Sequence, residues 1–179
     1  MISVELTVGL KIPDLTALTA ANAIRRRLGY ADALQALHRS DYYRLDLDVG
    51  DRDAAEALAR ELAEETNLFV NPNKHTYQVR FPEDHAADAR QDGEYTVNVL
   101  VSNPDDSAGE GILSALRGRL GYGDRVRGVD TGVLWTMQLA ADSPGQAREI
   151  AEDIAVTRSQ SEGILINPHF QDYEMWLGE

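Results

Sequence analysis

The chain of 179 residues contains no cysteine, which excludes disulfide bonds and thiolate metal sites. It has no apolar run near the roughly 20 residues that cross a bilayer, and it opens directly on an alternating strand pattern. We therefore expect no membrane segment, no signal peptide and a cytoplasmic location. Apolar residues still make up 43% of the chain, which is enough to form packed cores.

Basic residues are also scarce, because 17 lysines and arginines stand against 30 acidic residues and give a net charge of −13. Such a surface repels phosphate backbones and anionic lipid headgroups. We therefore expect neither nucleic acid nor membranes as partners. The acidic surface has two interpretations: it keeps the chain in solution, or it contacts a basic protein partner.

Recognisable catalytic motifs are missing as well. There is no Gly-x-Ser-x-Gly nucleophile elbow and no Walker loop. Two carboxylate pairs, Asp46 with Asp48 and Asp105 with Asp106, have no convergent partner for acid–base chemistry. No two histidines lie at a metal-ligand spacing; they are His38, His75, His85 and His169. The sequence predicts no catalytic site, no metal and no cofactor.

What the chain does contain is an internal repeat. The motif Arg-x-Arg-Leu-Gly-Tyr stands at 25–30 and again 92 residues later, at 117–122. An Asn-Pro pair followed by a tyrosine stands at 71–77 and again 96 residues later, at 167–173. The larger second offset indicates a short insertion in the second copy, which we place in the loop 157–163.

The segment 82–93 separates the two copies. It is polar, begins with proline and ends with glycine, which is typical of a linker. The sequence therefore predicts two domains, a first unit at 1–81 and a second unit at 94–179, joined by this linker.

Alternating apolar residues predict strands, and apolar residues at helical spacing predict helices. In the first copy Asp14 is the expected N-cap of a helix that Gly29 ends. The expected order is strand, helix, strand, strand, helix, strand, at 2–10, 14–28, 34–37, 43–49, 54–63 and 77–81. The second copy repeats this order at 95–101, 106–120, 125–129, 133–139, 144–155 and 173–177.

This order is β-α-β-β-α-β, twice, which is the order of the ferredoxin-like fold. We therefore predict an α+β protein of two ferredoxin-like βαββαβ units in tandem. Each unit would be an antiparallel four-stranded sheet with its two helices on one face.

The sheet face opposite the helices differs between the copies. It is polar in the first copy, whereas in the second it includes Leu100, Leu134 and Trp176. Because a large apolar face is not stable in water, we predict that these faces are buried against each other or against another protein chain. Trp135 lies on the opposite side of its strand, so we expect it in the core.

Matching residues at the ends of the first helices are further candidates for an interface. Arg27 and Arg119 fall where a cation suits the helix dipole, and they could also form ion pairs across an interface. Tyr30 and Tyr122 follow each helix, where we expect them to cover the cores or to contact a partner. The candidate interface residues are thus Arg27, Tyr30, Leu100, Arg119, Tyr122, Leu134 and Trp176.

The motifs of both copies follow a known family pattern. The second copy reads Asp-x-x-Gly at 106–109, Leu-Gly-Tyr at 120–122, Val-x-x-Val at 126–129 and Asn-Pro at 167–168. The first keeps Leu-Gly-Tyr at 28–30, Leu-x-x-Leu at 34–37 and Asn-Pro at 71–72. Each copy thereby resembles the PurS family, the small subunit of phosphoribosylformylglycinamidine synthase. Both copies lack the complete Arg-x-Gly-Lys stretch that family members carry after the second strand.

The resemblance implies a non-catalytic assembly subunit in purine biosynthesis. It would bridge a PurL-like synthetase, which uses ATP, and a PurQ-like glutaminase, which supplies ammonia. Family members are single units that dimerise, so a tandem copy is similar to that dimer written as one chain. Self-association, a tandem ACT-like protein that binds small molecules, and an enzyme acting alone are the alternatives.

Overall fold

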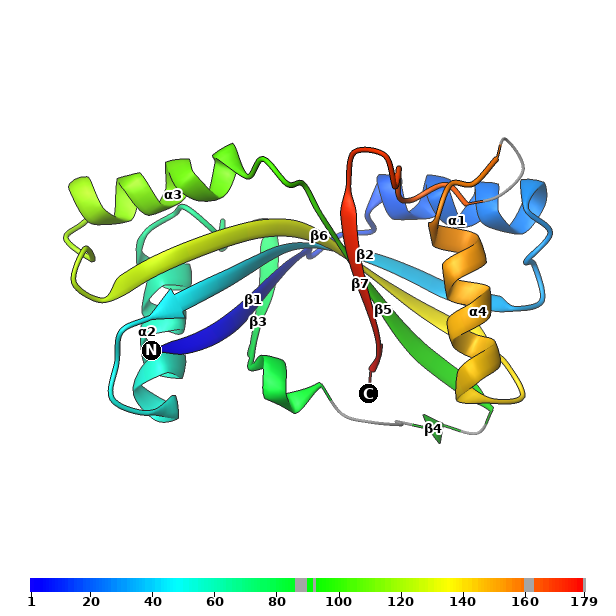
Figure 1. The fold of residues 1–179 in the computed structure, drawn as a ribbon, viewed down its shortest axis with the longest axis horizontal. Coiled ribbons are helices and arrows are strands. Elements are labelled where there is room, and N and C mark those ends of the chain that lie inside the picture. Colours follow the sequence, from blue (N-terminus) through cyan, green and yellow to red (C-terminus); the bar gives the residue numbers. More distant parts are fainter. Residues whose placement is uncertain (86–89, 92, 160–162, 179) are drawn as a thin grey trace. The chain divides into compact units, whose positions relative to one another are not determined.

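The computed structural model describes residues 1–85, 90–91, 93–159 and 163–178, and it is a mixed α+β protein (Figure 1). No described helix has the length and apolar character needed to cross a membrane. The elements are β1 (Ile2–Leu10), α1 (Leu15–Arg27), β2 (Leu34–Leu47), α2 (Arg52–Glu65), β3 (His75–Arg80), the short 3₁₀ helix η1 (Pro82–Asp84), β4 (Arg90–Gln91), β5 (Glu94–Ser102), α3 (Ser107–Gly118), β6 (Val126–Ala140), α4 (Pro144–Ala155) and β7 (Asp172–Gly178).

The helices begin and end where the sequence predicts. Asp14 caps α1 by accepting hydrogen bonds from the backbone N–H groups of Thr16 and Ala17, at 2.7 and 3.2 Å. After each first helix the chain turns through a glycine with a left-handed backbone, Gly29 at φ 82° and Gly121 at φ 77°. This conformation favours glycine because it has no Cβ atom, so the Leu-Gly-Tyr motif is a helix stop in both copies.

The expected pair of short middle strands is wrong in both copies. β2 and β6 are each one uninterrupted strand, of 14 and 15 residues (Figure 1). The segment 38–42 contains neither glycine nor proline, so nothing in it forces a turn. Gly132, at the corresponding place in β6, does not adopt a positive φ. Each copy therefore continues straight where a β-hairpin was predicted.

The long strands change how the chain divides into compact units. The first unit of the structure comprises Met1–Ile12, Ser40–Asp84 and Asp105–Gly132. The second unit of the structure comprises Pro13–Arg39, His85–Pro104 and Val133–Glu179. The predicted domains 1–81 and 94–179 are therefore not the compact units of the structure. The physical reason is that β2 and β6 each pass from one unit to the other, so the first helix of each copy packs with strands of the other copy.

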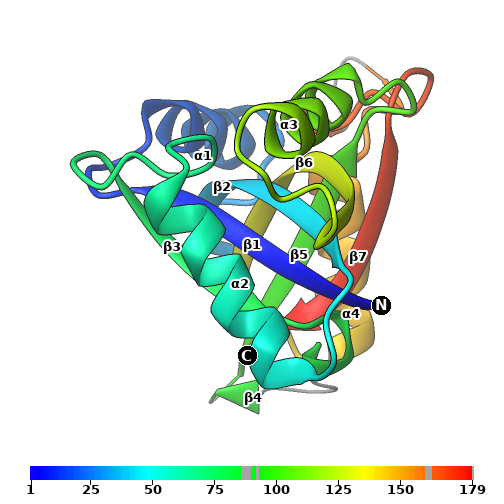
Figure 2. The ribbon, with the colours of Figure 1, turned by 90° about the vertical axis from the view of Figure 1, so that its left-hand side faces the viewer.

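The first unit joins its strands in the order β3-β1-β2-β6. Helix α2 lies along β1 and β3 (Figure 2). α3, which comes from the second copy, contributes Leu116 to the same core. That core also includes Val4, Leu6, Leu45, Leu58, Leu62 and Val126. Residues of both copies are thus needed to fill it.

The second unit joins its strands in the order β2-β6-β5, with β7 also paired to β5. Its helices are α4, from the second copy, and α1, from the first. Ile24 and Leu34 of the first copy share its core with Val97, Met137, Ile154 and Leu177 of the second. Trp135 is buried in this core, as the sequence predicts.

The predicted linker 82–93 is only partly described, because 86–89 and 92 lie outside the described residues. In its described part, Pro82–Asp84 form η1, and β4 pairs with β5. The predicted insertion in the loop 157–163 includes 160–162, which also lie outside the described residues.

Gly109 allows α3 to pack very close to β6 within the first unit. A Cβ atom at this position would lie 2.3 Å from the backbone oxygen of Val129, closer than any real contact. A Cβ atom at Gly111, in the same helix, would meet nothing within 4 Å. The corresponding residue of α1 is Ala17, so α1 cannot approach its own strand as closely.

The two glycines give a matched pair of variants. We expect Gly109→Ala to destabilise the protein by about 1–3 kcal/mol, because helix and strand must move apart. We expect Gly111→Ala to be neutral or to stabilise by up to about 1 kcal/mol, because alanine favours a helix. Urea unfolding measures both free energies, and equal effects at the two positions would contradict the close packing.

The exchange of helices between the copies predicts that neither copy folds alone as a monomer. Fragments 1–81 and 94–179, expressed separately, each lack part of both cores and should be unfolded or self-associated. Mixing the two should restore the circular dichroism spectrum and the cooperative melting of the intact chain. A folded, monomeric fragment in light scattering would contradict the exchange.

Candidate functional site

The predicted apolar face of the second unit is present. Leu100 and Leu134 are directly opposite each other on β5 and β6, and both are half-buried. Trp176 is half-buried too and stacks on His85, with ring centroids 4.3 Å apart. Beside them Asn98 is almost fully buried and accepts a hydrogen bond from the hydroxyl of Thr136 at 2.8 Å. This face thus combines apolar side chains with one satisfied amide.

The matching face of the first unit is polar, as predicted, but it is not uniformly exposed. Glu5 is only 5% exposed and accepts a hydrogen bond from the hydroxyl of Tyr42 at 2.8 Å. Asp46 accepts one from the hydroxyl of Ser3 at 2.6 Å. The burial of Glu5 was not expected from its place in an alternating pattern.

Tyr30 and Tyr122 make matching contacts, one in each unit. The hydroxyl of Tyr122 donates to Glu61 of α2 at 2.9 Å, and that of Tyr30 reaches Asp153 of α4 at 3.4 Å. Each tyrosine also packs against the core of its unit. Each contact joins the first helix turn of one copy to the second helix of the other. The tyrosines therefore help to hold the exchanged halves together.

Arg27 and Arg119 are exposed at the ends of their helices. The arginines that make the contacts lie two residues earlier, and the sequence analysis missed them. Arg25 donates to the backbone oxygens of Leu34 and Gln35 at 3.1 and 2.6 Å. Arg117 does the same to the strand that follows its own helix, at 3.4 and 2.7 Å. Because this pair repeats at the 92-residue offset, comparison of the two copies could have found it.

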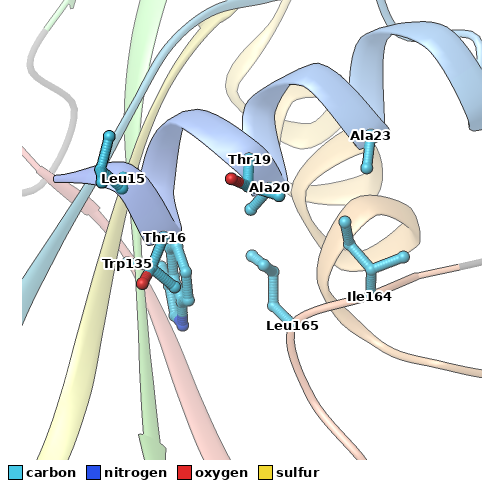
Figure 3. Close-up of a pocket in the computed structure, with 8 residues that line it drawn as sticks. All are labelled: Leu15, Thr16, Thr19, Ala20, Ala23, Trp135, Ile164 and Leu165. Atoms are coloured by element: carbon cyan, nitrogen blue, oxygen red, sulfur yellow. The ribbon is translucent and has the colours of Figure 1, made fainter.

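An apolar pocket of about 510 Å³ lies in the second unit beside α1 (Figure 3). Trp135, Ile164 and Leu165 face the side of α1 that carries Thr16 and Ala20 (Figure 3). The complete lining is Leu15, Thr16, Thr19, Ala20, Ala23, Trp135, Ile164 and Leu165. None of these residues was singled out as a binding residue from the sequence.

Two of the side chains that line this pocket are smaller than their counterparts in the other copy. At the 92-residue offset, Ala20 corresponds to Ile112 of α3, which packs on the core of the first unit. At the 96-residue offset, Leu165 corresponds to Phe69, whose ring packs edge-on against Tyr43 at 5.0 Å. Alanine and leucine have fewer atoms than isoleucine and phenylalanine, whereas Trp135 is larger than its counterpart Tyr43. The difference between the copies was visible in the sequence.

Large apolar side chains are exposed around this part of the second unit. Leu15 and Leu18 of α1 are 76% and 48% exposed, and Phe170 is 73% exposed. Ile164, at the pocket, is also exposed. The residues of the first unit at the positions of Leu15, Leu18 and Phe170 are polar, namely Ser107, Glu110 and Lys74. At these three positions the second unit is therefore apolar where the first unit is polar.

Three of the four acidic residues considered for acid–base chemistry, Asp46, Asp48 and Asp106, have structural partners. Asp48 forms an ion pair with Arg127 at 2.7 Å, and this hydrogen bond lowers the pKa of the Asp48 carboxyl. The carboxylate of Asp46 accepts a hydrogen bond from the hydroxyl of Ser3. Within the described ranges no three His, Asp or Glu side chains gather closely enough to hold a metal ion.

Asp106 accepts several hydrogen bonds. Burial alone would raise the pKa of its carboxyl, but hydrogen bonds from the backbone N–H groups of Gly109 and Thr131 and from the Thr131 hydroxyl outweigh this. The pKa of Asp106 is therefore lowered. The carboxylate caps α3 and ties it to β6, which is a structural role.

The pKa of Asp106 is lower in the folded state than in the unfolded chain, where it is about 4. Ionised Asp106 therefore stabilises the fold at pH values above the pKa of the unfolded chain. This stabilisation is lost as the pH falls through the pKa of the folded state. We expect Asp106→Ala to cost about 1–2 kcal/mol at pH 7 through the lost cap. The difference from wild type should shrink in acid, as measured by urea unfolding at several pH values. The exposed neighbour Asp105→Ala is the control, and a difference independent of pH would contradict the assignment.

Comparison with known proteins gives no family assignment for this chain. No family model matches it, and no curated protein matches it. A functional interpretation therefore depends on the residues and the geometry described above.

Proposed function

We propose that this protein is a non-catalytic assembly subunit of PurS type. It would work in a cytoplasmic phosphoribosylformylglycinamidine synthase complex of purine biosynthesis, where it bridges a PurL-like synthetase and a PurQ-like glutaminase. The motif resemblance of both copies supports this proposal. So do the structural roles of the carboxylates considered for catalysis, since Asp46, Asp48 and Asp106 are held by neighbouring side chains or backbone.

The ferredoxin-like part of the interpretation takes a modified form in this proposal. Each unit has strands of both copies and two helices that share one core, α2 with α3 and α1 with α4. This is consistent with two ferredoxin-like units whose first helices and adjoining half-strands are exchanged. Because both copies belong to one chain, their association is intramolecular, which fits a dimer fused into one chain.

The exposed apolar side chains of the second unit carry the proposal. A leucine that is three-quarters exposed, as Leu15 is, gains free energy when a partner covers it. Polar residues at the same positions of the first unit indicate that the two units meet different surroundings. A subunit whose two units differ at corresponding exposed positions suits a bridge between two different proteins.

A tandem ACT-like regulator is the competing function. The pocket beside α1 favours it, because a regulator needs a place for its small molecule and the pocket has a suitable volume. A partner protein would cover the exposed leucines, whereas a small molecule would occupy the pocket, so separate experiments test the two functions.

The assembly function is tested by glutamine-dependent synthesis with the PurL-like and PurQ-like proteins of the same organism. We expect activity to require this chain, whereas activity with added ammonium salt should not. Leu18→Glu, which introduces the residue of the other copy, should weaken complex formation about tenfold or more, because a buried leucine contributes about 1.5–3 kcal/mol.

Leu120→Glu is the matched control for this variant, because Leu120 is a similarly exposed leucine at the end of the other first helix. It should leave the complex intact. Full glutamine-dependent activity without the chain, together with no complex in sedimentation, would refute the assembly function.

A further inference from the structure

The pocket beside α1 has the size of a small-molecule site. Its volume of about 510 Å³ falls within the roughly 300–1,000 Å³ that is usual for ligand pockets. All eight lining residues belong to the second unit, and they come from α1, β6 and the segment before β7. The pocket opens to solvent, because Leu15 and Ile164 of its lining are exposed.

Comparison of the two copies shows where side chains around the pocket differ in size. Ile112, Leu113 and Phe69 pack on the core of the first unit. The second unit has Ala20, Ala21 and Leu165 at these positions. Two of these smaller residues, Ala20 and Leu165, line the pocket.

The lining determines which chemical class of ligand fits. None of its eight side chains is ionisable, so a charged group would lose its hydration without gaining a partner. Trp135, which is only 7% exposed, offers a large apolar surface away from water. The hydroxyls of Thr16 and Thr19 and the indole N–H of Trp135 are the polar side-chain groups of the lining, and they suit one hydroxyl or carbonyl group.

We propose that this pocket binds a small, uncharged, mainly hydrocarbon ligand with a ring that packs on Trp135 and one hydroxyl or carbonyl group directed at α1. The site goes beyond the assembly function but shares Leu15 and Ile164 with the exposed apolar surface that supports it, so a bound ligand would control assembly. A large apolar side chain of a partner protein is the other occupant, and the experiment below separates the two.

Trp135 provides the signal for the test. The chain has two tryptophans, so Trp176→Phe leaves Trp135 as the single reporter. We would titrate this variant with 4-cyclohexylcyclohexanol, which is neutral and does not absorb in the tryptophan range. A saturable change in emission is expected, and the matched anion 4-cyclohexylcyclohexanecarboxylate should bind about tenfold more weakly or not at all.

Ala20→Ile in the same background introduces the residue of the first copy and should fill the pocket. We expect it to weaken binding of the alcohol about tenfold or more, with unchanged circular dichroism. Ala57→Ile, at an exposed alanine of α2, is the matched control and should bind as before. No saturable change in the Trp135 variant, or equal binding by the Ala20→Ile variant, would overturn the proposal; the first result would leave the pocket to a partner's side chain.

Discussion

The whole arrangement depends on two strands that do not turn. β2 and β6 run uninterrupted for 14 and 15 residues, although each copy could in principle form a hairpin there. A straight strand carries the first helix of its copy away from its own second helix. That helix must bury its apolar side elsewhere, and the strands of the other copy provide the surface. The mixing of residues from both copies in each core is consistent with this arrangement.

The contacts that hold the exchanged halves are repeated in both units. Arg25 and Arg117 each bind two backbone oxygens of the strand after their helix, which fixes the angle between helix and strand. Tyr30 and Tyr122 then reach an acidic residue on the second helix of the opposite copy. Arginine suits this position because its planar guanidinium presents several donors in a fixed geometry. The two units therefore share one framework of polar contacts.

On this common framework the two units have diverged in volume and in surface. The first unit fills the space beside α3 with Ile112 and Phe69, whereas the second leaves a pocket beside α1. The same helix in the second unit exposes leucines where the first has serine and glutamate. Because one chain carries both copies, each can change without the matching change in the other, which a dimer of identical units does not allow.

The sequence by itself determined the local structure. Alternation gave the strands, and capping residues such as Asp14 together with Gly29 and Gly121 set the limits of the helices, since these signals depend only on neighbouring residues. The tertiary structure alone decided whether β2 and β6 turn or continue, because 38–42 is compatible with either and the choice depends on distant partners. It likewise decided that Arg25 rather than Arg27 makes contacts, and that Ala20 borders a pocket. Such outcomes depend on which surfaces meet in three dimensions, and the order of residues along the chain does not specify this locally.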